Sequence, residues 1–256
     1  MGIFARFRRS GKGAGLKVPT VPSGLLLYAV GDIHGRDDLF AELLDRIDAD
    51  RRSHDHDECI LILLGDLVDR GPDSNKVIDR ALAAAPRFDR FHHLIGNHEE
   101  CMIQALTGDA RALRYFVKIG GDATIRSYMC DDPKYDAASY EELASIFSQV
   151  VPATHTEFLD RGEDLVAYGD YVFVHAGIRD EIPIDRQKVS DLRWIREDFL
   201  RSNASRDVVV VHGHTISNNV EEQPHRIGID TGAYVSGVLT AVGLSADRRW
   251  FLQTGI

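Results

Sequence analysis

Histidine, aspartate and asparagine residues follow five short apolar runs of this sequence, and their side chains suit divalent metal ions. Each run has the length of a buried β-strand, and each polar group stands beside a glycine. The polar segments are residues 31–35, 65–72, 96–99, 175–177 and 212–215. In α/β proteins, ligand-binding groups gather at the carboxyl ends of strands. Because carboxylate, imidazole and amide oxygens without thiolate suit Mn²⁺, Fe²⁺ or Zn²⁺, the sequence predicts a metal site.

One aspartate stands where a two-metal site needs a shared ligand. Two ions roughly 3.5–4 Å apart require a carboxylate that bridges them. Asp66 lies between the Asp-x-His pair formed by Asp32 and His34 and the later polar groups. Asp66 is therefore the predicted bridge.

The elements that must position these groups alternate between strand and helix. Apolar runs predict strands over residues 25–30, 59–64, 91–95, 171–174 and 208–211. Leu39, Phe40, Leu43, Leu44 and Ile47 are spaced to form one buried face of a helix.

A second helix is predicted over residues 75–85, with Pro86 ending it. Residues 101–165 are helical by period and predict a helical insertion beside the site. The tail from residue 226 to 253 alternates and turns at glycines like antiparallel strands. The predicted fold class is therefore α/β (α+β).

Charge divides the chain into two parts. The 256 residues carry a net charge of −10, but residues 1–24 hold five basic residues and no acid. We expect residues 1–24 to be a flexible basic arm and residues 25–256 to be a single catalytic domain. Its acidic body argues against nucleic-acid binding. No apolar run approaches the roughly 20 residues that cross a bilayer, so we expect a cytoplasmic protein without stable membrane insertion.

The cysteines exclude one class of phosphatase. They show no C-x-x-C spacing and are predicted to be reduced thiols. A cysteine-nucleophile phosphatase needs an arginine six positions after its cysteine. The residues six positions after Cys59, Cys101 and Cys130 are Gly65, Thr107 and Asp136. A cysteine mechanism is therefore excluded.

Three of the polar segments form a specific pattern. It has 30 residues between His34 and Gly65 and 25 residues between Arg70 and Gly96. The three segments read Gly-Asp-Ile-His-Gly (31–35), Gly-Asp-Leu-Val-Asp-Arg-Gly (65–71) and Gly-Asn-His-Glu (96–99). This pattern resembles the phosphoprotein phosphatase family of calcineurin-like metallophosphoesterases. His-Ala-Gly (175–177) and Gly-His-Thr (213–215) extend the resemblance.

The phage and bacterial branch of that family is the most similar. Trp-Ile-Arg-Glu (194–197) and Ile-Asp-Thr-Gly-Ala (229–233) resemble segments of this branch, and the likeness covers residues 25 to about 245. The resemblance implies a β-sandwich flanked by helices. It also implies two divalent ions, most simply Mn²⁺, with Fe or Zn as alternatives.

The resemblance implies a role for each matching position. Asp32 and His34 would hold the first ion, Asp66 would bridge, and the second ion would be completed by Asn97, His175 and His214. Arg70 and Arg196 would bind phosphate oxygens, beside the amide of Asn97. His98, oriented by Asp69, would protonate the leaving group. The nucleophile would be a metal-bound hydroxide.

Two of these assignments stay open. His212 and His214 both stand at a strand end, and the Gly-His-Thr pattern selects His214. His212 is either a further ligand or a packed residue. Arg196 either binds phosphate or pairs with Glu197 or Asp198 on the surface.

The preferred interpretation is a phosphomonoesterase that acts on phosphoserine and phosphothreonine in proteins, with phosphotyrosine as a further substrate. A sister family hydrolyses symmetrical bis(5'-nucleosyl) tetraphosphates, and it usually has alanine where Asp69 stands. A dimetal phosphodiesterase or nuclease tends to have Gly-His-x-His, whereas Ile216 occupies the last position here. The non-enzymatic alternative is a pseudophosphatase that binds phosphate. The sequence leaves the oligomeric state open.

Overall fold

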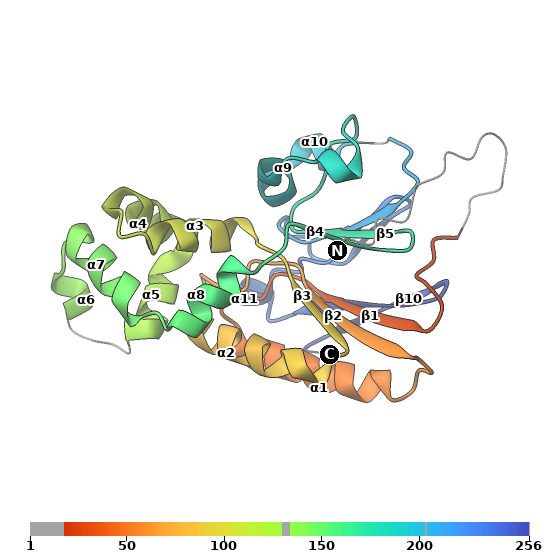
Figure 1. Ribbon diagram of the computed structural model, residues 1–256, viewed down its shortest axis with the longest axis horizontal. Coiled ribbons are helices and arrows are strands. Elements are labelled where there is room, and N and C mark those ends of the chain that lie inside the picture. The colour runs from red at the N-terminus through yellow and green to blue at the C-terminus, as the bar shows by residue number, and fades with distance from the viewer. Residues whose placement is uncertain (1–17, 130–133, 203, 256) are drawn as a thin grey trace.

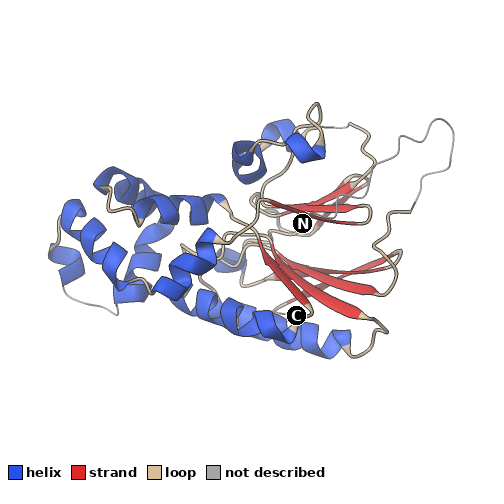
Figure 2. Ribbon diagram, viewed as in Figure 1, coloured by secondary structure: helices blue, strands red, loops and turns tan. Residues whose placement is uncertain are grey.

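Two five-stranded β-sheets pack face to face, with helices on their outer sides (Figures 1 and 2). The computed structural model describes residues 18–129, 134–202 and 204–255. The strand order is β10-β9-β1-β2-β3 in the first sheet and β4-β5-β6-β8-β7 in the second. This is the α+β sandwich that the sequence predicted.

Each sheet contains three parallel strands, and the carboxyl ends of these strands lie at the same end of the sandwich. The first sheet consists of β1 (Leu25–Val30), β2 (Glu58–Leu63), β3 (Arg90–His93), β9 (Thr240–Ser245) and β10 (Arg248–Gln253). The second consists of β4 (Leu165–Tyr168), β5 (Tyr171–Val174), β6 (Val209–His212), β7 (Glu221–Gln223) and β8 (Arg226–Gly228). Strands β1, β2 and β3 are parallel, as are β5, β6 and β8.

The apolar run of β1 is buried on both faces because it lies between two hydrophobic cores. Successive side chains of a strand point to opposite faces. Leu26, Tyr28 and Val30 pack against the helices, whereas Leu27 and Ala29 pack between the two sheets. A run without polar alternation is the pattern expected for such a buried strand.

Helices cover both outer faces of the sandwich. Helices α1 (Asp37–Arg51) and α2 (Ser74–Ala84) lie along the first sheet, and the short helices α9 (Val189–Trp194) and α10 (Glu197–Leu200) lie over the second (Figure 1). Helix α11 (Ala233–Ser236) precedes β9.

The remaining helices form a lobe at one end of the sandwich, on the left of Figure 1. The lobe comprises α3 (Asn97–Ala105), α4 (Ala110–Phe116), a π-helical turn (Val117–Gly121), α5 (Asp122–Met129), α6 (Lys134–Ala137), α7 (Tyr140–Val150) and α8 (Ala153–Asp160). The lobe shares a hydrophobic core with α1 and α2, in which the rings of Phe116 and Phe147 stack. The helical insertion is thus continuous with the main core.

The expected strands and helices form close to their predicted bounds, with three differences. The helical insertion was predicted to end at residue 165, and no strand was predicted directly after it, but Leu165–Tyr168 forms β4, which pairs antiparallel with β5. β8 was expected to be antiparallel like the rest of the tail, but it runs parallel to β6. The connection after β6 includes the short strand β7, which was not predicted. β7 runs antiparallel to β8 and brings the chain back to the end of the sheet where β6 begins.

The end of the predicted arm packs against the sandwich. Thr20 donates two hydrogen bonds to Asp170, from its backbone at 2.9 Å and its hydroxyl at 3.1 Å, and Val21 is buried. Residues 1–17 of the arm lie outside the described residues. Cys59 and Cys101 are free and buried, and Cys130 also lies outside the described part.

No helix in the described part of the chain is long and apolar enough to span a bilayer. The cytoplasmic location remains a prediction.

Candidate metal centre

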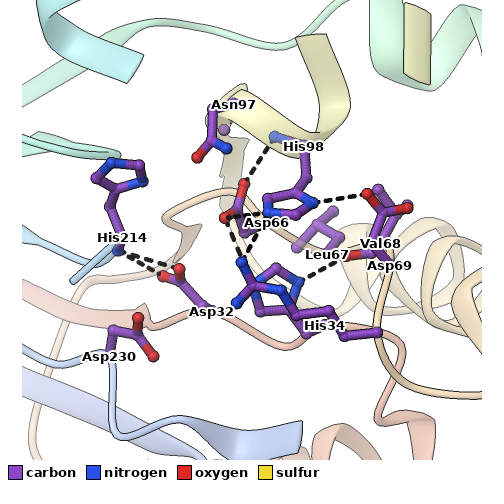
Figure 3. A network of polar contacts seen from close by, with 12 residues as sticks. Asp32, His34, Asp66, Leu67, Val68, Asp69, Asn97, His98, His214 and Asp230 are labelled. Carbon is purple, nitrogen blue, oxygen red and sulfur yellow. Dashed lines mark hydrogen bonds and ion pairs between the residues drawn. The ribbon is translucent and has the colours of Figure 1, made fainter. Parts of the chain in front are cut away.

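The predicted ligands come from five loops that meet at the carboxyl ends of the parallel strands. The loops follow β1, β2, β3, β5 and β6, so segments far apart in the chain face one region (Figure 3). The buried polar side chains that they contribute are Asp32, His34, Asp66, Asn97, His98, His175 and His214. The fold therefore brings all the predicted ligands into one buried cluster.

The backbone of these loops adopts conformations that side chains ordinarily avoid. Among the described residues, six non-glycine residues have positive φ, and five of them stand in these loops. The five are His34, Asp66, Asp69, Arg70 and His214, with φ between 46° and 73°. Each such residue costs on the order of 1–3 kcal/mol, and such strain gathers at functional sites. The loops are thus held in place by their surroundings.

Glu99 stabilises the loop of Asp66 through hydrogen bonds to its backbone. Its buried carboxylate accepts hydrogen bonds from four backbone N–H groups, at 2.7 to 3.2 Å. The donors are Asp66, Leu67, Val68 and Gly96. Burial raises the pKa of Glu99 to about 7, and the backbone hydrogen bonds oppose that rise. This role of Glu99 was not predicted from the sequence, although Glu99 stands three residues after Gly96, at a helix start.

His34 and His175 are fixed as neutral rings with one defined tautomer. His34 Nδ1 lies 2.7 Å from the Val68 carbonyl oxygen, and His175 Nδ1 lies 2.9 Å from that of Leu64. A carbonyl oxygen only accepts, so each Nδ1 carries the proton. Burial lowers the pKa of His175 to about 4 and that of His34 well below its usual value. Each Nε2 therefore presents a lone pair.

These lone pairs face other electron-rich atoms. Asp66 lies 3.5 Å from His34 Nε2 through one oxygen and 3.4 Å from His175 Nε2 through the other. Asn97 Oδ1 lies 3.1 Å from His175 Nε2. His214 Nδ1 lies 3.2 Å from the same atom and presents a further lone pair in the tautomer whose proton is on Nε2. Lone pairs that converge without a proton between them repel, whereas a cation would turn the same contacts into coordination.

The donors divide into two groups that share Asp66. Among the described residues, one group is His34, Asp66 and His98, and the other is Asp66, His175 and His214. In each group the ligand atoms all lie within 4.8 Å of one another. The residues present therefore fit two divalent cations with Asp66 between them.

Asp32 lies beside these groups but in neither of them. Its carboxylate accepts hydrogen bonds from the backbone N–H of His214 at 3.0 and 3.2 Å. Asp230, a second buried carboxylate, stands next to it in Figure 3. Burial raises the pKa of Asp32 well above its usual value, and the charges of Asp230 and Asp66 raise it further. Such crowded carboxylates are stabilised by nearby cations, but ligation by Asp32 stays a prediction.

His98 joins the metal cluster to a buried carboxylate, as the resemblance implied. His98 Nδ1 lies 2.6 Å from Asp69 Oδ2, and Arg70 Nη2 lies 3.0 Å from His98 Nε2. Because Arg70 only donates, the ring proton is on Nδ1 and is donated to Asp69. The guanidinium of Arg70 also stacks on the ring of Tyr234, with its central carbon 4.8 Å from the ring centroid.

Arg196 and His212 were the two open assignments. Arg196 is exposed, and no described residue forms a hydrogen bond or ion pair with its side chain. Burial is the main cause that lowers the pKa of His98 and of His214, and the positive charge of Arg196 lowers both further. His212 belongs to neither donor group. Its Nδ1 lies 3.0 Å from the Gly213 carbonyl, and its ring meets Phe199 edge-on. The structure therefore favours packing for His212.

A family profile described as Calcineurin-like phosphoesterase matches residues 25–237. This chain belongs to that family. The matched range encloses the second sheet, strands β1 to β3 of the first sheet and the helical lobe, and it ends before β9 and β10. With the clustered donors, membership indicates a metal-dependent phosphoesterase with a divalent dimetal centre.

The most informative relatives are named as bis(5'-nucleosyl)-tetraphosphatases. An asymmetrical enzyme of Halalkalibacterium halodurans is 28% identical over 236 residues, which covers 83% of this chain and 87% of the relative. A symmetrical enzyme of Delftia acidovorans is 41% identical over 90 residues, but the match spans only 29% of that relative. A crystal structure named a "putative diadenosine tetraphosphatase" superimposes with a TM-score of 0.62 at 19% identity, covering 92% of this chain and 98% of the other.

The substitution Asp66→Asn tests the shared carboxylate. Removing the negative charge between the two donor groups should abolish binding of both ions, and activity with them. The metal-to-protein ratio after gel filtration, measured by mass spectrometry, checks this expectation. Asp73→Asn, which removes a surface carboxylate paired with Lys76, is the control and should retain both ions. Two ions in Asp66→Asn would contradict the shared role.

The substitution His212→Gln tests a buried histidine outside the donor groups. Burial lowers the pKa of His212 to about 4, so the unfolded chain binds a proton below pH 6.5 that the folded chain does not. In the metal-free protein this residue should cost about 3 kcal/mol of stability as pH falls from 6.5 to 4. Urea unfolding across that range should show a smaller loss for His212→Gln. Loss of bound metal in this variant would instead assign His212 to the metal centre.

Proposed function

We propose that this protein hydrolyses bis(5'-nucleosyl) tetraphosphates at an off-centre phosphoanhydride, which yields a nucleoside triphosphate and a nucleoside monophosphate. The observation that carries the proposal is the match to the asymmetrical tetraphosphatase, which covers 83% of this chain and 87% of that relative. The two chains therefore correspond over nearly the whole domain. The match to the symmetrical enzyme is limited to 35% of this chain.

The site has the groups that phosphoryl transfer needs. When bound, the two cations would neutralise phosphoryl charge and lower the pKa of the attacking water. His34, Asp66, Asn97, His175 and His214 would hold them, with Asp32 as a further proposed ligand. His98 would not, because its Nδ1 donates to Asp69 and its Nε2 accepts from Arg70. We propose Mn²⁺ for both ions, with Fe or Zn as alternatives.

The two arginines would hold the substrate. Arg70 and Arg196 offer planar donors to phosphate oxygens, and phosphate bound by Arg70 would stand next to His98 Nε2. The acid would be the imidazolium form of His98, in which Nδ1–H stays hydrogen-bonded to Asp69 and Nε2 carries a second proton. That Nε2 proton would pass to the departing oxygen as its bond to phosphorus breaks. Asp69 keeps the imidazole oriented for that transfer through the 2.6 Å hydrogen bond.

The Asp69–His98 pair favours a second candidate, a phosphomonoesterase on phosphoserine, phosphothreonine and phosphotyrosine in proteins. A nucleotide leaves an anhydride through a phosphate oxygen whose pKa is about 6, so it needs little protonation. Serine leaves as an alkoxide, which needs a proton donor as it departs. Asp69 is also the residue that favours a phosphoprotein substrate in the sequence, because the symmetrical tetraphosphatases usually have alanine at this position.

Incubation of the metal-loaded protein with diadenosine tetraphosphate tests the proposal. We expect ATP and AMP in equal amounts on ion-exchange chromatography, and none with a chelator present. Two molecules of ADP would contradict off-centre cleavage. Phosphate release from a phosphoserine peptide, without nucleotide products, would establish the second candidate instead. Binding of both compounds without products would make the protein a phosphate-binding pseudophosphatase.

The substitution His98→Asn tests proton donation. With a phosphoserine peptide, turnover should fall by about 10²–10⁴, the usual contribution of a general acid. With the tetraphosphate, whose leaving group needs little protonation, the loss should be below about tenfold. Steady-state kinetics on both substrates measures the difference. Equal losses on both would refute the acid role.

A further inference from the structure

Thr124, on α5 of the helical insertion, connects the insertion to the candidate site. Thr124 is fully buried and stands 55 positions from Asp69 in the chain, yet the two residues are in direct contact. Asp69 is the carboxylate that orients His98. The insertion therefore reaches the metal centre through this side chain.

The hydroxyl of Thr124 uses its whole hydrogen-bonding capacity at this point. It donates to Asp69 Oδ1 at 2.6 Å and accepts from the backbone N–H of Asp69 at 2.8 Å. Its oxygen also lies 2.8 Å from the hydroxyl of Ser74. A hydroxyl offers one donor and two acceptor positions, so all three are occupied.

The two oxygens of Asp69 thus have separate partners. Thr124 holds Oδ1 and His98 holds Oδ2, with Asp69 fully buried between them. Asp69 has φ of 73°, a conformation that its surroundings must impose. Without the hydroxyl, Oδ1 would be a buried acceptor lacking its donor, and the carboxylate would turn away from the geometry that fixes the ring of His98.

The insertion makes a second contact next to Asp69. The backbone N–H of Arg70 donates to the carbonyl of Gly120 at 3.1 Å. Gly120 has φ of 121°, and a Cβ there would lie 2.9 Å from Arg70 Cγ. A side chain at this position would therefore push on Arg70 as well as strain the backbone.

We propose that Thr124 is a positioning residue, through which the helical insertion holds Asp69 so that His98 can deliver its proton to the leaving group. The inference rests on the proposed function of His98 as the acid. It predicts that loss of the hydroxyl damages reactions with poor leaving groups more than reactions with good ones. A purely structural role would slow both equally.

Three variants isolate the hydroxyl. Thr124→Val replaces it with a methyl group of similar volume, and Thr124→Ser restores it. Ser127→Ala is the matched control, because Ser127 lies on the same helix and accepts a hydrogen bond from the backbone of Asn75 on α2 without touching Asp69.

The kinetic test compares phenyl phosphate with p-nitrophenyl phosphate, whose phenol leaves more readily. We expect Thr124→Val to lose about tenfold more kcat/KM on phenyl phosphate than on p-nitrophenyl phosphate. Thr124→Ser and Ser127→Ala should retain the wild-type ratio. Equal losses on both substrates in Thr124→Val, with His98→Asn still sensitive to the leaving group, would overturn the role of Thr124 alone. Insensitivity in His98→Asn as well would show that the proposed acid function has failed.

A second measurement needs no turnover. In protein loaded with diamagnetic Zn²⁺ and labelled with ¹⁵N-histidine, His98 Nδ1–H should give a slowly exchanging low-field proton resonance. Thr124→Val should lose that resonance through faster exchange, whereas Thr124→Ser and Ser127→Ala should keep it. An unchanged resonance in folded Thr124→Val would overturn the proposal.

Discussion

The arrangement depends on the repulsion among electron-rich atoms around Asp66. Two imidazole lone pairs, from His34 and His175, are fixed toward its two carboxylate oxygens at 3.5 and 3.4 Å. Burial raises the pKa of Asp66 to about 6, since its charge is removed from water. This arrangement lowers the stability of the folded protein, because it combines fixed rings, a buried carboxylate and strained loops. Cations in the space that these groups face would offset the loss. The fit to two divalent ions follows from this constraint.

The two hydrophobic cores of the sandwich stabilise the fold against this unfavourable free energy, and they lie apart from the charged loops. The apolar faces of β1 and β2 contribute to both hydrophobic cores, while the loops after these strands carry charge. Glu99 ties the loop of Asp66 to the start of α3 through four backbone hydrogen bonds. Thr124 ties Asp69 to the insertion. Both ties come from helices of the lobe, α3 and α5, so the lobe contributes to the site as well as to the core.

The metal cluster was predictable from sequence because each ligand follows a strongly apolar run, and parallel strands bring their carboxyl ends together. Glu99, Thr124 and Asp230 were missed because their roles depend on partners that only the tertiary fold brings near. The strand β4 was missed because Leu165–Tyr168 is short and adjoins a long helical region. The choice of substrate was also beyond the sequence pattern, since phosphate esters and anhydrides use the same ligands and differ in the leaving group.

The most direct test of the cation argument is the anomalous diffraction of crystals grown with Mn²⁺. Two peaks are expected, one on each side of the Asp66 carboxylate, with His34 beside one and with His175 and His214 beside the other. A single peak away from Asp66, or none at saturating Mn²⁺, would contradict the claim that this carboxylate lies between two ions.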